Sequence, residues 1–366
     1  MIDILERLEL KVENDIAISP YFRQDIEREA DLAEEIVRIY GYDKLDSTLI
    51  SADTTLGAKT KQQKIEDKLK NLMVDSGFSE IYTYGMIKES DLVKSNIAKE
   101  SDLVKSIIKI RNPLSEDYTI MRTTTIPSMM QTITLNYNKK NKEVKLFDMS
   151  RTYKNENGEI EKGEVPLEEK ILTVGAYGKE IDFYVLKGIV ENVLETAGVA
   201  RYDIVKEKEN PSYHPGKTAN IKVGKDVVAT LGEIHPVVCN NYGINEKIYM
   251  AEINIDKIVR YAKSAKKYSA IAKFPAVERD IALTVDEKVE VGSIENIIKK
   301  NAKKILETAE LFDIYRSDKL GKNKKSVAYA LTFREQNKTL NDEEVNRVME
   351  KVIKALEEQL GAELRK

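Results

Sequence analysis

The feature that most constrains the fold is the order of apolar patterns in residues 273–366. Stretches in which every second residue is apolar alternate with stretches in which apolar residues recur every three or four positions. They predict strand, helix, strand, strand, helix and strand at Val277–Asp286, Val291–Ala302, Ile305–Tyr315, Lys325–Phe333, Asn341–Leu360 and Ala362–Arg365. Asn341 and Glu344 have the capping-box spacing that begins a helix. This order is that of the ferredoxin-like β-α-β-β-α-β unit.

Residues 61–272 contain a longer alternation of helical and strand-like stretches. Helices are predicted at Lys61–Ser76, Ile126–Asn136, Tyr184–Ala197 and Pro236–Tyr242. Strands are predicted at Ile81–Met86, Val144–Asp148, Ile171–Ala176, Thr218–Val223, Val227–Ile234 and Ile248–Ile253. Because short polar turns, such as the one at Gly224, connect some of these strands, we expect a mainly antiparallel sheet. The whole chain is therefore expected to have an α+β fold.

Residues 1–50 form a third, shorter region. A strand is predicted at Lys11–Ser19 and a helix at Ile26–Tyr40, followed by Gly41 at the position of a C-terminal cap. The small and polar residues at 51–60 predict a linker. Because the region begins inside a periodic apolar pattern, we expect only part of a domain here.

Composition excludes several classes of protein. With 42% hydrophobic and 33% charged residues, the chain is expected to fold as two or three soluble domains. It has no apolar run of about 18 residues, which predicts that it does not enter a membrane, and its N-terminus lacks a secretory signal pattern. The single cysteine, Cys239, excludes a disulfide framework. We therefore expect a cytoplasmic protein.

Common catalytic motifs are missing from the sequence. No serine lies in a G-x-S-x-G motif, and neither the P-loop nor the G-x-G-x-x-G pattern occurs. His214 and His235 each precede a proline, and structural positions beside turns are the favoured interpretation. An enzyme that uses His214 or Glu233 in a pocket of the central region is an alternative.

Four carboxylates gather at the start of the helix predicted at Ile26–Tyr40. Glu34 and Glu35 follow Asp31 by three and four residues, so the three share one helix face, and Asp25 precedes them. Oxygen ligands of this kind suit Mg²⁺. The alternative is that the helix dipole favours acidic residues near a helix N-terminus. Spacing alone leaves both interpretations open.

A local excess of positive charge marks the ferredoxin-like region. Between positions 316 and 338 the sequence contains seven basic residues and two acidic ones. The basic residues are Arg316, Lys319, Lys322, Lys324, Lys325, Arg334 and Lys338, and the acidic ones are Asp318 and Glu335. A basic face of this kind suits contact with phosphates. The alternative is a solvated lysine-rich loop.

Several longer motifs resemble one family. YFRQDIEREADLAEEIVRIYGY at residues 21–42 resembles the signature of the B5 domain of bacterial phenylalanine–tRNA ligase (phenylalanyl-tRNA synthetase) β subunits. Similarity to the B6–B7 region of that family is carried by NPLSED at 112–117, MRT at 121–123, LFDMSR at 146–151, YHPG at 213–216 and LGEIHP at 231–236. FPAVERDI at 274–281 resembles the opening of the family's ferredoxin-fold anticodon-binding domain. The matches follow the family's order and resemble the C-terminal half of such a subunit.

The resemblance implies a domain plan and a set of partners. Residues 1–50 would be a partial B5 domain, 51–60 a linker, 61–272 a non-catalytic class II synthetase-like B6–B7 domain, and 273–366 the anticodon-binding domain. The chain would belong to an α₂β₂ heterotetramer that charges tRNA(Phe) with phenylalanine. ATP would bind on the catalytic α subunit, and this chain alone is expected to be inactive. The alternative is a stand-alone RNA-binding protein built on the ferredoxin-like domain.

The resemblance also implies two sets of site residues. The family's Mg²⁺ ligands match Asp25, Asp31, Glu34 and Glu35, near the contact with the α subunit. Phosphates of tRNA would lie near Lys322, Lys324, Lys325 and Arg334. Alternation places Tyr329 and Phe333 on one strand face, which either stacks on bases or faces the core.

Overall fold

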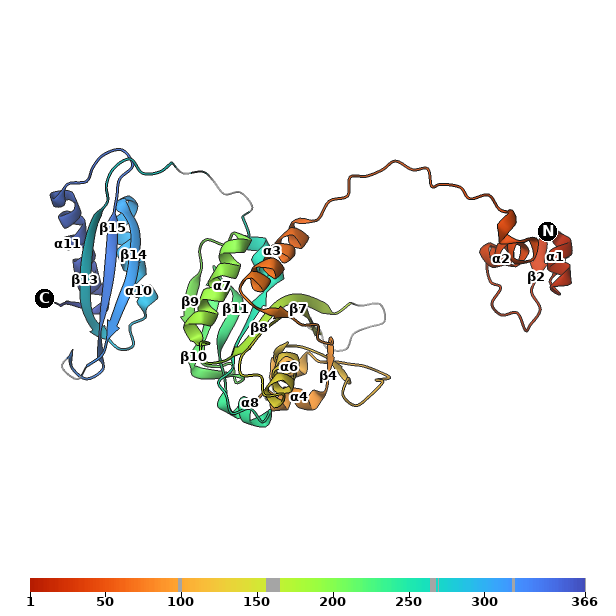
Figure 1. Cartoon of the computed structure of the whole chain (residues 1–366), viewed down its shortest axis with the longest axis horizontal. Coiled ribbons are helices and arrows are strands. Elements are labelled where there is room, and N and C mark those ends of the chain that lie inside the picture. Colours follow the sequence, from red (N-terminus) through yellow and green to blue (C-terminus); the bar gives the residue numbers. More distant parts are fainter. Residues whose placement is uncertain (98–100, 156–164, 264–267, 269, 318–319, 366) are drawn as a thin grey trace. The chain divides into compact units, whose positions relative to one another are not determined.

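The computed structural model describes residues 1–97, 101–155, 165–263, 268, 270–317 and 320–365. The chain divides into two compact units, Met1–Ala58 and Lys59–Lys366 (Figure 1). Within the second unit, the ferredoxin-like residues have a hydrophobic core of their own, distinct from the cores of the central region.

The N-terminal unit contains two helices, α1 (Ile2–Arg7) and α2 (Glu29–Tyr40), and a hairpin of β1 (Lys11–Glu13) and β2 (Ile16–Ile18). The single strand predicted at Lys11–Ser19 is therefore wrong. Asn14 and Asp15 turn the chain with φ of 50° and 60°, a left-handed conformation that Asn and Asp tolerate better than other side chains. Gly41 caps the C-terminus of α2 with φ of 110°, as predicted.

A seven-stranded sheet in the order β3-β7-β8-β12-β11-β10-β9 forms the centre of the second unit. Its strands are β3 (Ser79–Glu80), β7 (Val144–Lys154), β8 (Leu167–Tyr177), β9 (Asp203–Lys206), β10 (Tyr213–Val223), β11 (Asp226–Ile234) and β12 (Tyr249–Asn254). Every neighbouring pair is antiparallel except β3 and β7. The predicted antiparallel sheet is confirmed, and most strands extend beyond their apolar stretches.

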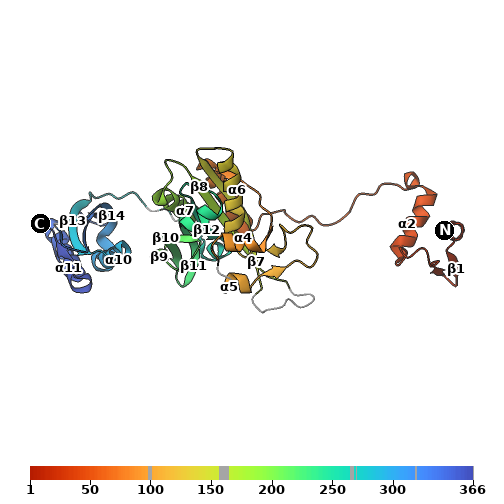
Figure 2. The ribbon, with the colours of Figure 1, turned by 90° about the horizontal axis from the view of Figure 1, so that it is seen from below.

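Helices cover both faces of this sheet. Leu69 of α3 (Lys61–Asp75), Val190 of α7 (Phe183–Ala197) and Ile258 of α9 (Ile255–Tyr261) join one apolar core. The opposite face carries α6 (Ile126–Asn138) and α8 (Pro236–Asn241), which have a separate core. Figure 2 shows α6 and α7 on opposite sides of β8 and β12. Gly175 of β8 lets α6 approach, because a Cβ there would lie 2.7 Å from Cγ of Met129.

The strand predicted at Ile81–Met86 is wrong, because the chain changes sheets within it. The Ile81 N–H donates to the Phe147 carbonyl of β7 at 2.8 Å, and the Gly85 carbonyl accepts from the Arg122 N–H at 2.9 Å. Beyond this crossing, β4 (Met86–Ile87), β5 (Ile108–Lys109) and β6 (Ile120–Met121) form a small three-stranded sheet in the order β4-β6-β5. Helices α4 (Glu89–Lys94) and α5 (Asp102–Lys105) accompany it.

The ferredoxin-like domain confirms its predicted element order. Strands β13 (Val277–Asp286), β14 (Leu306–Tyr315), β15 (Lys324–Phe333) and β16 (Glu363–Leu364) form a sheet in the order β14-β15-β13-β16. Figure 2 shows helices α10 (Val291–Ala302) and α11 (Asp342–Leu360) on the same face of this sheet. The Asn341 side chain accepts from the Glu344 N–H at 2.8 Å, which confirms the predicted capping box.

Candidate functional site

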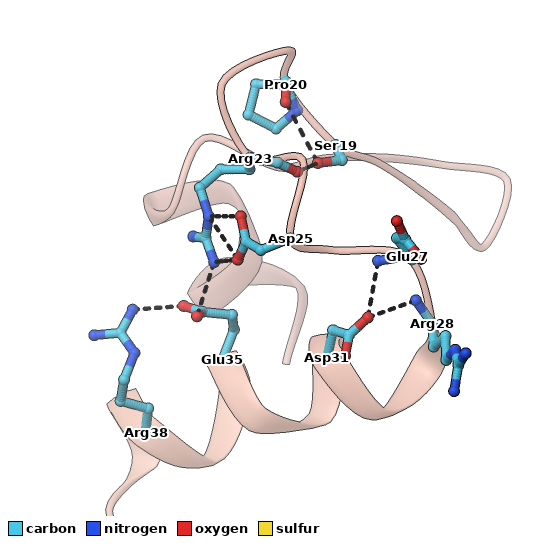
Figure 3. Close-up of polar contacts among 9 residues, drawn as sticks. All are labelled: Ser19, Pro20, Arg23, Asp25, Glu27, Arg28, Asp31, Glu35 and Arg38. Carbon is cyan, nitrogen blue, oxygen red and sulfur yellow. Dashed lines mark hydrogen bonds and ion pairs between the residues drawn. The ribbon is translucent and has the colours of Figure 1, made fainter. Parts of the chain in front are cut away.

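Arg23 is the centre of the polar contacts in the N-terminal unit. Its Nε donates to Oδ1 of Asp25 at 3.0 Å, and its Nη2 donates to Oδ2 of Asp25 at 2.7 Å and to Oε1 of Glu35 at 2.9 Å (Figure 3). Arg38 donates to the other oxygen of Glu35. The Arg23 guanidinium lowers the pKa of Asp25. The hydrogen bond from Arg38, and to a smaller extent the one from Arg23, lowers the pKa of Glu35.

Asp31 contacts backbone amides at the start of α2. Its Oδ2 accepts from the backbone N–H of Glu27 at 2.8 Å and of Arg28 at 2.7 Å (Figure 3). The carboxylate therefore satisfies the backbone amide of the N-cap residue Arg28 and that of the residue before it. Glu34, one residue before Glu35, is exposed.

These contacts do not form a cation cage. Among the residues that the structure describes, no group of three or more His, Cys, Asp or Glu side chains is placed to hold a metal ion. Asp25 and Glu35 meet at a guanidinium, while Asp31 binds backbone amides. In this arrangement the carboxylates do not fit Mg²⁺, because Arg23 occupies the space between two of them. The Mg²⁺ site therefore stays a prediction.

The four basic residues predicted to contact RNA do not form one exposed cluster. Lys325 is buried and donates to the carbonyls of Glu287 and Val289 at 3.0 and 2.7 Å. Lys324 forms an ion pair of 2.7 Å with Glu363, and Arg334 forms one of 2.8 Å with Glu307. Lys322 is exposed. Lys319, part of the basic stretch noted in the sequence, lies outside the described residues.

The aromatic residues of β15 face the interior. Tyr329 and Phe333 are fully buried in the core under α10 and α11. The core interpretation of these side chains is therefore confirmed, and base stacking on them is excluded in this arrangement.

A basic groove that the sequence analysis missed lies on the helical side of the same domain. Its volume is about 730 Å³, and it lies between the end of α10, the short helix η2 (Lys303–Ile305) and one face of α11. Four lysines line it, Lys303, Lys304, Lys351 and Lys354, together with the single acid Glu358. The signal in the sequence was the KKNAKK run at 299–304 with two lysines three residues apart in α11.

The central region contains a polar cavity of about 460 Å³ that involves strands β7, β8, β11 and β12. Oε1 of Glu252 accepts from Oγ1 of Thr124 at 2.7 Å and from Oγ1 of Thr125 at 2.8 Å. Lys154, which also lines the cavity, forms an ion pair of 2.8 Å with Glu169. The other lysine of the lining, Lys257, donates to the Val227 carbonyl at 3.3 Å. Both lysines therefore already have partners within the chain, and the remaining lining of apolar, hydroxyl, amide and carboxylate groups is a poor partner for a nucleotide triphosphate.

The two histidines have structural contacts. Nδ1 of His214 accepts from the Gly216 N–H at 3.0 Å, and Nδ1 of His235 accepts from the Val237 N–H at 3.1 Å. Both rings thus hold turns of the backbone, as the sequence predicts. Glu233 pairs with Lys217 at 2.7 Å.

Comparison with known families explains this combination of domains. Residues 45–255 match the family described as the phenylalanyl tRNA synthetase beta chain CLM domain, which is more than half of the chain. The chain belongs to this family. Residues 272–365 match the ferredoxin-fold anticodon binding domain, and residues 1–42 match the tRNA synthetase B5 domain.

Curated relatives agree with the family assignment. The phenylalanine–tRNA ligase beta subunit of Clostridium acetobutylicum is 44% identical over 369 residues, covering 100% of this chain and 46% of its own length. The same subunit of Clostridium tetani is also 44% identical, with the same coverage. The chain thus spans about half the length of the curated relatives it matches. A solved pyrrolysyl tRNA synthetase from Desulfitobacterium hafniense aligns with 55% of this chain and 72% of its own, at a TM-score of 0.44 and 16% identity.

No helix among the described residues is both long and apolar enough to cross a membrane.

Proposed function

We propose that this chain is the part of a phenylalanine–tRNA ligase β subunit that supports the catalytic α subunit and binds tRNA(Phe). The observation that carries the proposal is the series of three family matches, in one order along nearly the whole chain. The charging of tRNA with phenylalanine then belongs to an α₂β₂ complex in the cytoplasm, with ATP bound on the α subunit.

Each region has a separate role in this proposal. Residues 61–272 support the α subunit and perform no chemistry, which is consistent with a polar cavity whose Lys154 is already paired with Glu169. Residues 273–366 bind tRNA, which the name of their family supports. Residues 1–50 form part of a B5 domain, joined by the linker 51–60.

Mg²⁺ enters the proposal as a separate claim about the N-terminal unit. For Asp25, Asp31, Glu34 and Glu35 to act together on one ion, Arg23 has to leave Asp25 and Glu35. Asp31 also has to exchange its two backbone donors for the ion or its waters. No step of the charging reaction depends on this site here.

The test is size-exclusion chromatography with light scattering, on this chain mixed with the α subunit of the same organism. A complex with the mass of two α and two β chains is the expected result. A second channel measures binding of tRNA(Phe) to this chain alone. RNA binding without any complex would favour the alternative, a stand-alone RNA-binding protein. If the chain binds neither the α subunit nor tRNA, the proposed function is wrong.

A further inference from the structure

We propose that the basic groove between α10, η2 and α11 binds the phosphodiester backbone of RNA; the inference rests on the proposed binding of tRNA. Of its charged lining residues, four are lysines and one is an acid. All four lysines are exposed, and they come from two separate elements that meet at the groove. A surface with this charge attracts a polyanion and releases its counterions.

The helix dipole explains only part of this charge. Lys303 and Lys304 follow the C-terminus of α10, where the partial negative charge of the helix end stabilises cations. Lys351 and Lys354 lie well before the end of α11 at Leu360, so the dipole does not account for them. The contact of Lys354 with Glu358 is 3.9 Å between two exposed side chains, and a pair of this kind contributes little.

Lys303 occupies a backbone conformation that lysine disfavours. Its φ is 54° and its ψ is −133°, and its N–H donates to the Lys299 carbonyl at the end of α10. Positive φ favours glycine, because any Cβ is crowded there. Strain of this kind is often kept where a side chain has a task. A lysine at this strained position therefore supports a functional role of its ammonium group at the groove.

Three of the four basic residues that the sequence predicted to contact RNA are less available for phosphates. Lys325 is buried, whereas Lys324 and Arg334 form ion pairs with acids of the same domain.

The lining of the groove contains no aromatic residue on which a base could stack. Contacts to phosphate without stacking on bases position an RNA and do not read its sequence. The groove is thus suited to the backbone of a stem rather than to unpaired bases.

The experiment measures the affinity of the full chain for a tRNA(Phe) transcript at several salt concentrations. Lys351→Ala with Lys354→Ala is expected to weaken binding about tenfold, and to reduce the slope of log affinity against log salt by about 1.5. The matched control is Lys179→Ala with Lys288→Ala, which removes the same charge at two exposed positions outside the groove. The control is expected to change affinity less than about twofold.

Lys303→Gly separates function from folding. Glycine relieves the strain at this position, so the variant is expected to melt at a higher temperature while it binds RNA about threefold more weakly. A higher melting temperature with unchanged affinity would mean that Lys303 does not contact RNA.

The outcomes also separate this inference from the proposed function. If wild-type chain binds tRNA and the groove variants bind as the control does, the groove is not the contact surface and the tRNA-binding function stands. If Lys322→Ala alone causes the loss, the exposed end of the β14–β15 connection is the contact surface instead. If wild-type chain does not bind tRNA at low salt, the groove proposal and the tRNA-binding part of the proposed function are both wrong, while support of the α subunit is decided separately by light scattering.

Discussion

Nη2 of Arg23 lies 2.9 Å from Oε1 of Glu35, twelve residues further along the chain. The same nitrogen lies 2.7 Å from Oδ2 of Asp25, so one guanidinium joins the loop before α2 to the helix itself. Three of the four predicted metal ligands, Asp25, Asp31 and Glu35, thus already contact other groups of the protein. A divalent cation at this place would have to compete with Arg23 for the same two carboxylates.

Replacing Arg23 with glutamine tests this competition. Arg23→Gln removes the cation between Asp25 and Glu35, so the N-terminal unit is expected to be less stable without Mg²⁺. Added Mg²⁺ is expected to restore more stability to the variant than to wild-type chain, because a ligand that binds only the folded state stabilises it. Hydrogen exchange of the α2 amides, measured with Mg²⁺ and with a chelator, provides the readout.

The control for that experiment is Arg7→Gln, which removes one charge from the exposed surface of the same unit. Its exchange is expected to respond to Mg²⁺ as that of wild-type chain does, because Arg23 and the four carboxylates are unchanged. If Arg23→Gln responds to Mg²⁺ no more than Arg7→Gln does, Arg23 does not compete with the ion, and if neither variant responds, the carboxylates of this unit do not bind it.

The depressed pKa values of Asp25 and Glu35 predict a loss of stability in acid. Arginine contacts lower both values in the folded chain from the ordinary 3.8 and 4.5. As the pH falls, the unfolded chain therefore binds protons before the folded chain does. Their contribution is complete above about pH 4.5 and is lost as the pH falls through the two folded pKa values.

Hydrogen exchange of α2 between pH 7 and pH 3, corrected for intrinsic exchange rates, measures this loss. Glu35→Gln is expected to flatten the dependence, since it removes one of the two titrating groups. An unchanged acid dependence in that variant would show that Glu35 does not contribute.

Apolar periodicity correctly predicted the helices and strands that bury one regular face. It gave wrong elements where contacts between residues distant in sequence determine the structure. The bounds Val277–Asp286 and Val291–Ala302 are those of β13 and α10, because alternating or helical burial sets both. The segment 81–86 bonds to two different sheets, which no local pattern reveals. Lys325 was predicted to lie near phosphates because it belongs to the basic stretch between positions 316 and 338. Its two carbonyl partners, Glu287 and Val289, come from another part of the domain.

The same distinction applies to the candidate site. The sequence placed Asp31, Glu34 and Glu35 on one helix, and they lie in α2. The role of Arg23 was missed, because its contact with Glu35 depends on how the loop folds back over the helix. The basic groove was missed for a similar reason, since its lysines come from α11 and from η2.

The capping box of α11 predicts a local change in stability. The Asn341 side chain accepts from the Glu344 N–H at 2.8 Å, so Asn341→Ala leaves an amide of the helix start without its partner. The expected cost is about 1 kcal/mol. Faster hydrogen exchange in the first turn of α11 provides the measurement. Asn346→Ala, at an exposed position of the same helix, is the control and is expected to leave exchange unchanged or slower.

Substitution of glycine by alanine is expected to have opposite effects on stability at two positions of the central region, Gly175 and Gly188. A Cβ on Gly175 of β8 would lie 2.7 Å from Cγ of Met129 and 3.0 Å from Cδ1 of Ile133, both on α6. Overpacking of this kind is expected to destabilise the chain by about 1–3 kcal/mol. Gly188 lies within α7, and a Cβ added there would meet open space, with no atom beyond its own stretch of helix within 4 Å. Gly188→Ala is therefore expected to stabilise by about 0.5–1 kcal/mol.

Thermal unfolding of the two variants beside wild-type chain measures the contrast. Gly175→Ala should melt at a lower temperature and Gly188→Ala at a higher one, although both add one methyl group. Equal shifts would mean that α6 does not pack closely against β8. A loss of stability in Gly175→Ala that Met129→Ala partly reverses would identify the clash itself, because the shorter side chain leaves room for the added methyl group.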